Sequence, residues 1–158
     1  MTEEAAIEKQ VVTQFPFLLA KFRVARPRRI FAEVARDRFP EVFDYLVKKM
    51  NFTILCTITG LDLGDELGAI YHLARESGVT FNLRTAVPKT QPVLPSVTPY
   101  FPPADCYERE LVDLLGFKVE GLAPGSRYPL PDDWPAGQYP LRKDWNPEML
   151  DKKEAPHA

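Results

Sequence analysis

The sequence has no apolar run long enough to cross a membrane. About 20 consecutive apolar residues are needed to span a bilayer, and no stretch of this chain approaches that length. The first ten residues are polar and acidic, without the apolar core of a signal peptide. We therefore expect any association with a membrane to be made only through partners.

Cysteine and histidine are scarce. Cys56, Cys106, His72 and His157 are the only residues of these types, and they do not show the spacing of a zinc or iron–sulfur site. Two cysteines without paired spacing in a chain that lacks a secretion signal are usually free thiols, so both are predicted to be buried. The sequence also lacks a glycine-rich phosphate loop and a nucleophile with a partnering base. These absences argue against a metal site or a nucleotide site.

The chain also lacks a large excess of positive or negative charge, whereas proline is abundant. The formal net charge is −2, which gives no general attraction to nucleic acid or to an anionic membrane. The length of 158 residues fits one domain plus an appendage. The 16 prolines are roughly twice the average share, and most of them lie in the second half of the chain.

The first part of the chain contains one strand pattern and two helix patterns. Apolar and polar residues alternate over 18–24, which predicts a half-buried strand that Pro27 ends. Apolar stripes then predict two short helices, the first around 30–34 and the second with Phe43, Leu46, Val47 and Met50 as its stripe. Pro40 suits the first turn of that second helix.

Three further strands are predicted over 53–59, 67–74 and 79–85, where β-branched residues or clean alternation occur. Gly78 marks a turn between the last two, so they are expected to form an antiparallel hairpin. The order of strand, two helices and three strands predicts an α+β fold, with a mainly antiparallel sheet and helices on one face.

A final helix is predicted over 104–115, with Gly116 as its C-terminal stop. We divide the chain into an α+β domain, residues 1–120, and an extended proline-rich C-terminal arm, residues 121–158. The arm keeps large side chains, namely Tyr128, Leu130, Trp134, Tyr139, Leu141 and Trp145. Composition leaves open whether the arm lies on a partner or packs back on its own domain. The last residues, 152–158, are expected to fray.

The densest polar cluster is Glu108-Arg109-Glu110 followed by Asp113. On a helix, Arg109 shares a face with both Asp105 and Asp113, and Glu110 lies one turn from Asp113. Two close carboxylates could act as an acid and a base. A solvated face or an ion-pair network needs no further assumption, and the spacing alone favours that interpretation.

Two other polar segments concentrate charge. The run 140–145, Pro-Leu-Arg-Lys-Asp-Trp, is either a docking motif or an exposed charged turn. A basic run also occurs, formed by Lys21, Arg23, Arg26, Arg28, Arg29, Arg36 and Arg38. A nucleic-acid interpretation is disfavoured because Glu33 and Asp37 interrupt this run and no aromatic platform accompanies it. A solvated face or an acidic protein partner fits better.

Together the last helix and the arm resemble a known family. The blocks Glu108-Arg109-Glu110-x-x-Asp113-Leu114-x-Gly116, then Phe117 to Gly121, then Tyr139-Pro140-Leu141-Arg142-Lys143-Asp144 are similar to the signature of the NuoC-type subunit. That family occurs in respiratory complex I, in energy-converting nickel–iron hydrogenases and in formate hydrogenlyase-type complexes. Complex I members usually carry a His-Pro-Asp-Leu-Arg-Arg run after the Glu-Gly pair. In this chain the His and Asp of that run are absent, and only an arginine, Arg127, remains. This departure favours the hydrogenase branch.

The resemblance implies a non-catalytic subunit in the peripheral arm of a membrane-bound, ion-translocating redox complex. It implies no cofactor in this chain, with a nickel–iron site, iron–sulfur clusters or both in the partner subunits. The expected partners are a large subunit (nickel–iron or quinone-site) and a small iron–sulfur subunit, at the cytoplasmic face of the membrane. By resemblance, the partner interface comprises Glu108, Arg109, Glu110, Asp113, Arg127, Leu141, Arg142, Lys143, Asp144 and Trp145.

Three alternatives remain open at this point. One is a NuoC-type subunit of a respiratory NADH:quinone oxidoreductase. The others are a stand-alone hydrolase that uses the carboxylate cluster, and a nucleic-acid-binding module that uses residues 21–38.

Overall fold

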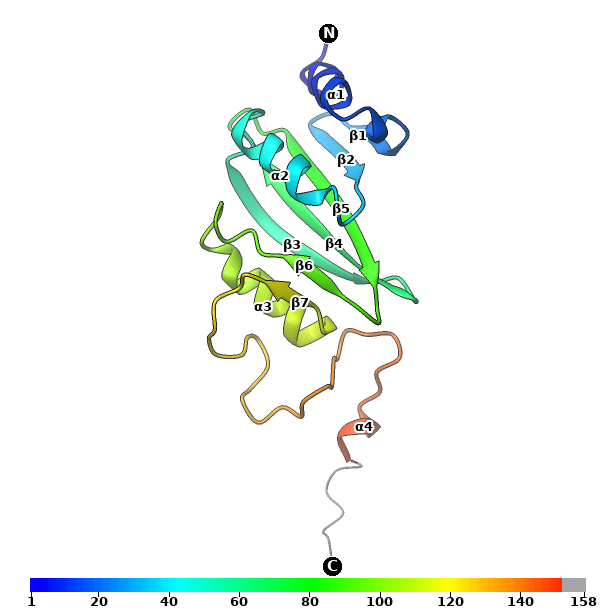
Figure 1. Ribbon diagram of the computed structural model, residues 1–158, viewed down its shortest axis with the longest axis vertical. Helices are drawn as coiled ribbons and strands as arrows, with labels where there is room; N and C mark the ends of the chain where they lie inside the picture. The colour runs from blue at the N-terminus through cyan, green and yellow to red at the C-terminus, as the bar shows by residue number, and fades with distance from the viewer. Residues whose placement is uncertain (152–158) are drawn as a thin grey trace, which may run out of the picture.

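The computed structural model describes residues 1–151, so the expected fraying of 152–158 lies outside the described residues. The elements in chain order are α1 (Glu3–Gln14), the 3-10 helix η1 (Pro16–Lys21), β1 (Phe22–Arg26), β2 (Arg29–Glu33), α2 (Phe39–Lys48), β3 (Ile54–Asp62), β4 (Glu66–Ala74), β5 (Thr80–Pro88), β6 (Val93–Pro95), α3 (Ala104–Leu115), β7 (Lys118–Glu120) and α4 (Glu148–Asp151). Figure 1 shows the sheet and its helices above, and the arm below.

The main sheet has five strands in the order β1-β2-β5-β4-β3. All neighbours run antiparallel except β2 and β5, which are parallel. A second, two-stranded parallel sheet joins β6 to β7. The prediction of a mainly antiparallel sheet in an α+β fold is therefore confirmed.

The helices α2 and α3 pack on one face of the main sheet. Tyr71 of β4 is buried against Phe39 and Phe43 of α2, with ring centroids 4.6 and 5.6 Å apart. Gly60 of β3 lies under Leu111 and Leu115 of α3, so closely that a Cβ atom would overlap their methyl groups. Both helices thus bury their apolar stripes in one continuous core.

Several predicted elements are confirmed. The helix α2 has Pro40 in its first turn, and the helix α3 has the predicted bounds. Gly116 ends α3 in the left-handed conformation, with φ of 78°. The β4–β5 hairpin turns at Gly78, whose φ of 81° is also left-handed.

The predictions for residues 18–34 are largely wrong. Residues 18–21 belong to the 3-10 helix η1, which Pro16 opens, and the strand begins only at Phe22. The predicted helix around 30–34 is the strand β2, and Pro27 and Arg28 form a hairpin turn before it. The apolar residues that suggested a helix belong to a strand instead, because β2 pairs with β5, about fifty residues away. This pairing buries Ile30 and Ala32.

Two further features differ from expectation. The helix α1 was not predicted; it buries Ile7 and Val11, spaced one turn apart in a largely polar sequence. Cys56 and Cys106 are exposed, so their predicted burial is wrong. Cys56 lies where the register of β3 shifts between its neighbours, and a residue displaced in this way leaves the alternation that would bury it.

Within residues 1–151, no helix has the length and apolar character needed to span a bilayer. In the same part of the chain, no group of three or more histidine, cysteine, aspartate or glutamate side chains is arranged to hold a metal ion.

Candidate functional site

The residues that carry the family resemblance gather around the helix α3. Ala104, Leu111 and Leu115 form its buried stripe, and the spacing of four, three and four residues places Glu108 on the same stripe. Arg109 and Asp113 face the segment that follows β7. The helix therefore touches the core on one side and the arm on another.

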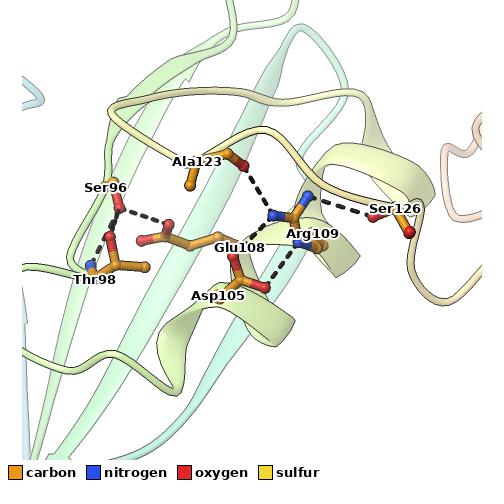
Figure 2. Close-up of polar contacts among 7 residues, drawn as sticks. All are labelled: Ser96, Thr98, Asp105, Glu108, Arg109, Ala123 and Ser126. Atoms are coloured by element: carbon orange, nitrogen blue, oxygen red, sulfur yellow. Dashed lines mark hydrogen bonds and ion pairs between the residues drawn. The ribbon is translucent and has the colours of Figure 1, made fainter.

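Glu108 is fully buried and fixes the segment between β6 and α3. Its Oε1 accepts a hydrogen bond from the Val97 N–H at 2.6 Å, and its Oε2 accepts one from Ser96 Oγ at 2.8 Å. Ser96 Oγ is also bonded to the Thr98 side chain and backbone N–H. Figure 2 shows the contacts of Ser96 with Glu108 and with Thr98. Burial raises the pKa of the Glu108 carboxyl, and the two donors act in the opposite direction.

Arg109 anchors the first part of the arm. Its guanidinium donates to both carboxylate oxygens of Asp105, at 2.8 and 2.9 Å, and to the Ala123 and Ser126 carbonyls, at 2.8 and 3.3 Å (Figure 2). The hydrogen bond from Arg109 lowers the pKa of Asp105 and raises the pKa of Arg109. Gly125 packs so closely on the guanidinium that a side chain there would displace it. A bidentate pair with two further acceptors holds the arm in one position.

Asp113 holds the next part of the arm. Its carboxylate accepts from Arg127 Nε and from the Leu130 N–H, both at 3.3 Å. Arg127 in turn donates to the Trp134 carbonyl at 2.6 Å. Because Asp113 is nearly buried, these donors replace the water that its carboxylate would otherwise bind.

The C-terminal end of α3 holds the following segment. The Leu141 N–H donates to the Leu114 carbonyl at 3.0 Å, and Arg142 Nε donates to the Leu115 carbonyl at 2.7 Å. The last carbonyls of a helix lack partners within the helix, so the arm supplies the missing donors. The Arg142 guanidinium also lies over the Tyr139 ring, 4.5 Å from its centroid.

Asp62, at the end of β3, is the last attachment point. Its carboxylate accepts from the Lys143 N–H, from Lys89 Nζ and from the Gly64 N–H, each at 2.8 Å. Lys89 also lies 3.6 Å from the Asp144 carboxylate. Burial opposes ionisation of Asp62, but the three donors outweigh it, and the pKa falls from its ordinary value of 3.8 to about 2.

The variant Asp62→Asn is expected to lower the free energy of unfolding by about 1–2 kcal/mol at neutral pH. A carboxyl whose pKa is lower in the folded state stabilises the fold above its unfolded value of 3.8, and that contribution disappears as pH falls through about 2. Urea unfolding followed from neutral pH down to about 2 should therefore show a larger acid-dependent loss in the wild type than in the variant. Parallel pH profiles would contradict this role for Asp62.

Most of the residues predicted as a partner interface are engaged within the chain. Glu108, Arg109, Asp113, Arg127 and Arg142 contact neighbouring segments, as described above, and so do the Lys143 backbone and Asp144. Of the remaining three, the Trp145 indole donates to the Gln138 side chain at 2.9 Å, and the Leu141 side chain is exposed. Glu110 makes no ion pair and no side-chain hydrogen bond among residues 1–151. Contact of these residues with a partner stays a prediction.

Asp62 and Lys89 were not predicted from the sequence, although Asp62-x-Gly64 has the pattern of a turn in which aspartate bonds a backbone N–H. For residues 121–151, the arm lies along its own domain, which is one of the two positions that composition had left open. The carboxylate pair considered for acid–base chemistry is not a free pair, because Asp113 is engaged by Arg127 and by the Leu130 N–H.

The fold and these contacts define a class of protein: a small α+β domain that carries an extended arm along its last long helix. The chain belongs to the family of the respiratory-chain NADH dehydrogenase 30 Kd subunit, which matches residues 32–149. The match includes α3 and nearly all of the arm that the structure describes.

Its relatives come from several redox complexes. The C subunit of F420H2 dehydrogenase from Methanosarcina mazei is 34% identical over 136 residues, covering 82% of this chain and 86% of that protein. The beta subunit of the membrane-bound hydrogenase from Pyrococcus furiosus is 28% identical over 143 residues, covering 87% and 83%. A chain of the membrane-bound sulfane sulfur reductase, an archaeal respiratory membrane complex, superposes with a TM-score of 0.83 at 29% identity, covering 98% and 92%. By contrast, the chain spans about half or less of the NADH-quinone oxidoreductase C subunits that it matches.

Proposed function

We propose that this chain is a non-catalytic subunit of a membrane-associated redox complex of the energy-converting hydrogenase type. In this role its α+β domain presents the C-terminal arm to the large subunit of the complex. The hydrogenase beta subunit, which matches over 83% of its own length, supports this branch, because the NADH-quinone oxidoreductase C subunits match over about half of theirs or less. The missing His-Pro-Asp run after Gly121 supports it as well.

The observation that carries the proposal is the use made of the signature residues. Arg109 and Asp113 direct their polar atoms to the arm and hold it, while Glu108 fixes the segment between β6 and α3. The arm, in turn, carries large apolar side chains that the domain leaves exposed, namely Tyr128, Leu141 and Met149. A motif that builds a rigid surface with exposed apolar side chains is suited to binding a protein.

An extended arm is a physically efficient way to join two subunits. It offers much surface per residue, and its prolines reduce the conformational entropy that would be lost when it binds. The contacts with α3 and Asp62 order the arm before the partner arrives. A preorganised surface binds more tightly than one that must fold on contact.

In this proposal the redox chemistry belongs to the partners. A large subunit with a nickel–iron site and a small iron–sulfur subunit would hold the redox centres. The complex would bring this chain to the cytoplasmic face of the membrane as a peripheral component.

The test is purification of the tagged chain from membranes of the native organism, with identification of the co-purifying subunits and a nickel assay. We expect a large subunit and nickel in the wild-type sample. The variant Leu141→Asp should recover at least about tenfold less large subunit, because it places a charge on an apolar anchor whose side chain is 58% exposed in the free chain.

The control is Ile54→Asp, which changes an exposed apolar residue on the edge strand β3, away from the arm. Both variants should keep the wild-type melting temperature within a few degrees. Equal recovery of the large subunit with both variants would contradict the role of the arm. Iron–sulfur partners without nickel would instead indicate the NADH:quinone oxidoreductase branch, and a wild-type chain that purifies alone would refute the subunit proposal.

A further inference from the structure

The hairpin of β1 and β2 lies at the outer edge of the main sheet, where β1 has no neighbouring strand on its other side among residues 1–151. Figure 1 shows this hairpin near the upper end of the molecule, whereas the arm occupies the lower end. A surface on the hairpin is therefore well separated from the surface that the arm offers.

The hairpin and its surroundings concentrate positive charge. Residues 16–38 contain seven basic and two acidic residues, although the whole chain has a net charge of −2. Three of the seven are paired: Lys21 with Glu33, Arg36 with Glu120, and Arg38 with Glu41. The other four side chains make no ion pair with any residue of 1–151, and these are Arg23, Arg26, Arg28 and Arg29.

The positions of these arginines work against the stability of the hairpin. Arg26 and Arg29 lie directly opposite each other across the two strands, and like charges in this position are destabilising. Arg28 has a φ of 60°, in the left-handed region that favours glycine. Glu4 accepts a hydrogen bond from the Arg28 N–H, so it holds the backbone of the turn. Within residues 1–151, no carboxylate pairs with the Arg26 or Arg29 guanidinium, so the fold gains no ion pair from them.

Apolar side chains are also exposed on η1 and on β1. Phe17 and Leu19 of η1 and Val24 of β1 are all exposed, Leu19 to 63%. The Arg38 guanidinium lies over the Phe17 ring, 4.6 Å from its centroid. Aromatic and aliphatic anchors rimmed by arginine are the composition of protein–protein interfaces. Charged residues also protect edge strands from unwanted pairing, but that role does not account for the exposed Phe17 and Leu19.

We infer that η1 and the β1–β2 hairpin form a second docking surface, which receives an acidic polypeptide segment with apolar side chains from another subunit. The inference rests on the proposed function only in taking that partner from the same complex. Each arginine offers paired donors that match a carboxylate, and Arg26 and Arg29 together would be neutralised by one or two of them. The acidic segment would thereby remove the repulsion that the free chain carries.

The geometry favours a polypeptide over a lipid surface. Val24 pairs with Ile30, which faces the core, whereas Arg23 pairs with Phe31 on the opposite face of the sheet. Val24 and Arg23 thus project to opposite sides of the sheet edge. A flat membrane engages one side, but a segment that runs along the edge contacts both. Single-stranded nucleic acid binds by stacking its bases on aromatic rings. It is disfavoured here because the Phe31 ring is already covered by the Arg23 guanidinium, 5.2 Å from the ring centroid.

The first test is charge reversal in the tagged chain, purified from membranes of the native organism. In the double variant Arg26→Glu and Arg29→Glu the two residues still repel each other, so the stability of the hairpin should change little. Recovery of one subunit with an acidic segment should fall at least about tenfold, while the large subunit bound through the arm is retained. The matched control is the double variant Lys9→Glu and Lys49→Glu. These two exposed lysines lie on α1 and next to α2 and make no ion pair within residues 1–151. Their reversal should leave the recovery of every subunit unchanged.

The second test identifies the contact directly. Arg26→Lys keeps the charge and introduces an amine that a zero-length carbodiimide reagent joins only to a touching carboxylate. Mass spectrometry of the cross-linked complex should show position 26 joined to an aspartate or glutamate of another subunit. Cross-links from position 26 confined to this chain would overturn the inference.

The outcomes separate this inference from the proposed function. A wild-type complex whose composition is unaffected by the double reversal overturns the inference alone, whereas a wild-type chain that purifies without any partner overturns both. The purified chain is also tested for binding to a DNA duplex and to vesicles of phosphatidylcholine and phosphatidylglycerol. We expect neither probe to show binding that the double reversal abolishes. Such binding to either probe would replace the acidic segment with that ligand and overturn the inference.

Discussion

Replacing Glu108 with alanine is expected to lower the free energy of unfolding by about 3 kcal/mol. Glu108 is fully buried, and both of its carboxylate oxygens are hydrogen-bonded, one by the Val97 N–H and the other by Ser96 Oγ. The alanine variant would leave the buried Val97 N–H without an acceptor and would open a cavity between α3 and the segment after β6. Each of these effects alone costs on the order of 1–3 kcal/mol.

The measurement is urea unfolding of the purified chain, with Glu110→Ala as the matched control. Glu110 occupies the same helix, two residues further on, and makes no ion pair and no side-chain hydrogen bond in residues 1–151. We expect the control to lose less than about 0.5 kcal/mol. Glu108→Gln should fall between the two, because the amide keeps one acceptor oxygen but replaces the other with an NH2 group, so Ser96 Oγ loses the acceptor to which it donates. Equal losses for Glu108→Ala and Glu110→Ala would show that the buried contacts contribute nothing.

The burial of Glu108 could have been predicted from the spacing of α3. Ala104, Leu111 and Leu115 lie on one stripe, and Glu108 is one turn after the first of them and three residues before the second. From the sequence, Glu108 was instead grouped with Arg109 and Glu110 as a polar cluster, since adjacent charges suggest a solvated face. Helical periodicity carries the stronger information here, because neighbouring residues in a helix point in different directions.

The local patterns were sufficient where the partners are near in sequence. The β4–β5 hairpin and the helices α2 and α3 have their turn, proline and capping residues within or beside the element, and all three were predicted correctly. The strand β2 was mistaken for a helix because its partner β5 lies about fifty residues away, and no local pattern reports a parallel pairing of that kind. The attachment of the arm to Asp62 and Lys89 was not predicted for the same reason, since those residues are distant from residue 143 in sequence.

Gly116→Ala is expected to destabilise the chain by about 3 kcal/mol and to release the arm from α3. Gly116 has a φ of 78°, which costs an alanine about 1 kcal/mol or more. A Cβ atom at this position would also lie 2.6 Å from Tyr139 Cε2 and 2.7 Å from Arg142 Nη2. Tyr139 and Arg142 would have to move, and the bond from Arg142 Nε to the Leu115 carbonyl would be lost.

Gly137→Ala provides the matched control, because Gly137 has a φ of 77° in the same arm and a Cβ atom there would meet no other atom within 4 Å. It should show only the conformational cost of about 1 kcal/mol, so the difference between the two variants measures the contact of the arm with the helix end. Urea unfolding gives the free energies, and limited proteolysis should cut the arm faster in Gly116→Ala alone. Equal destabilisation and equal cutting would mean that the arm is not held there. If the arm is released while the domain stays folded, Gly116→Ala should also lose the large subunit. The surface that the arm offers to that subunit is ordered by the contact of the arm with the end of α3.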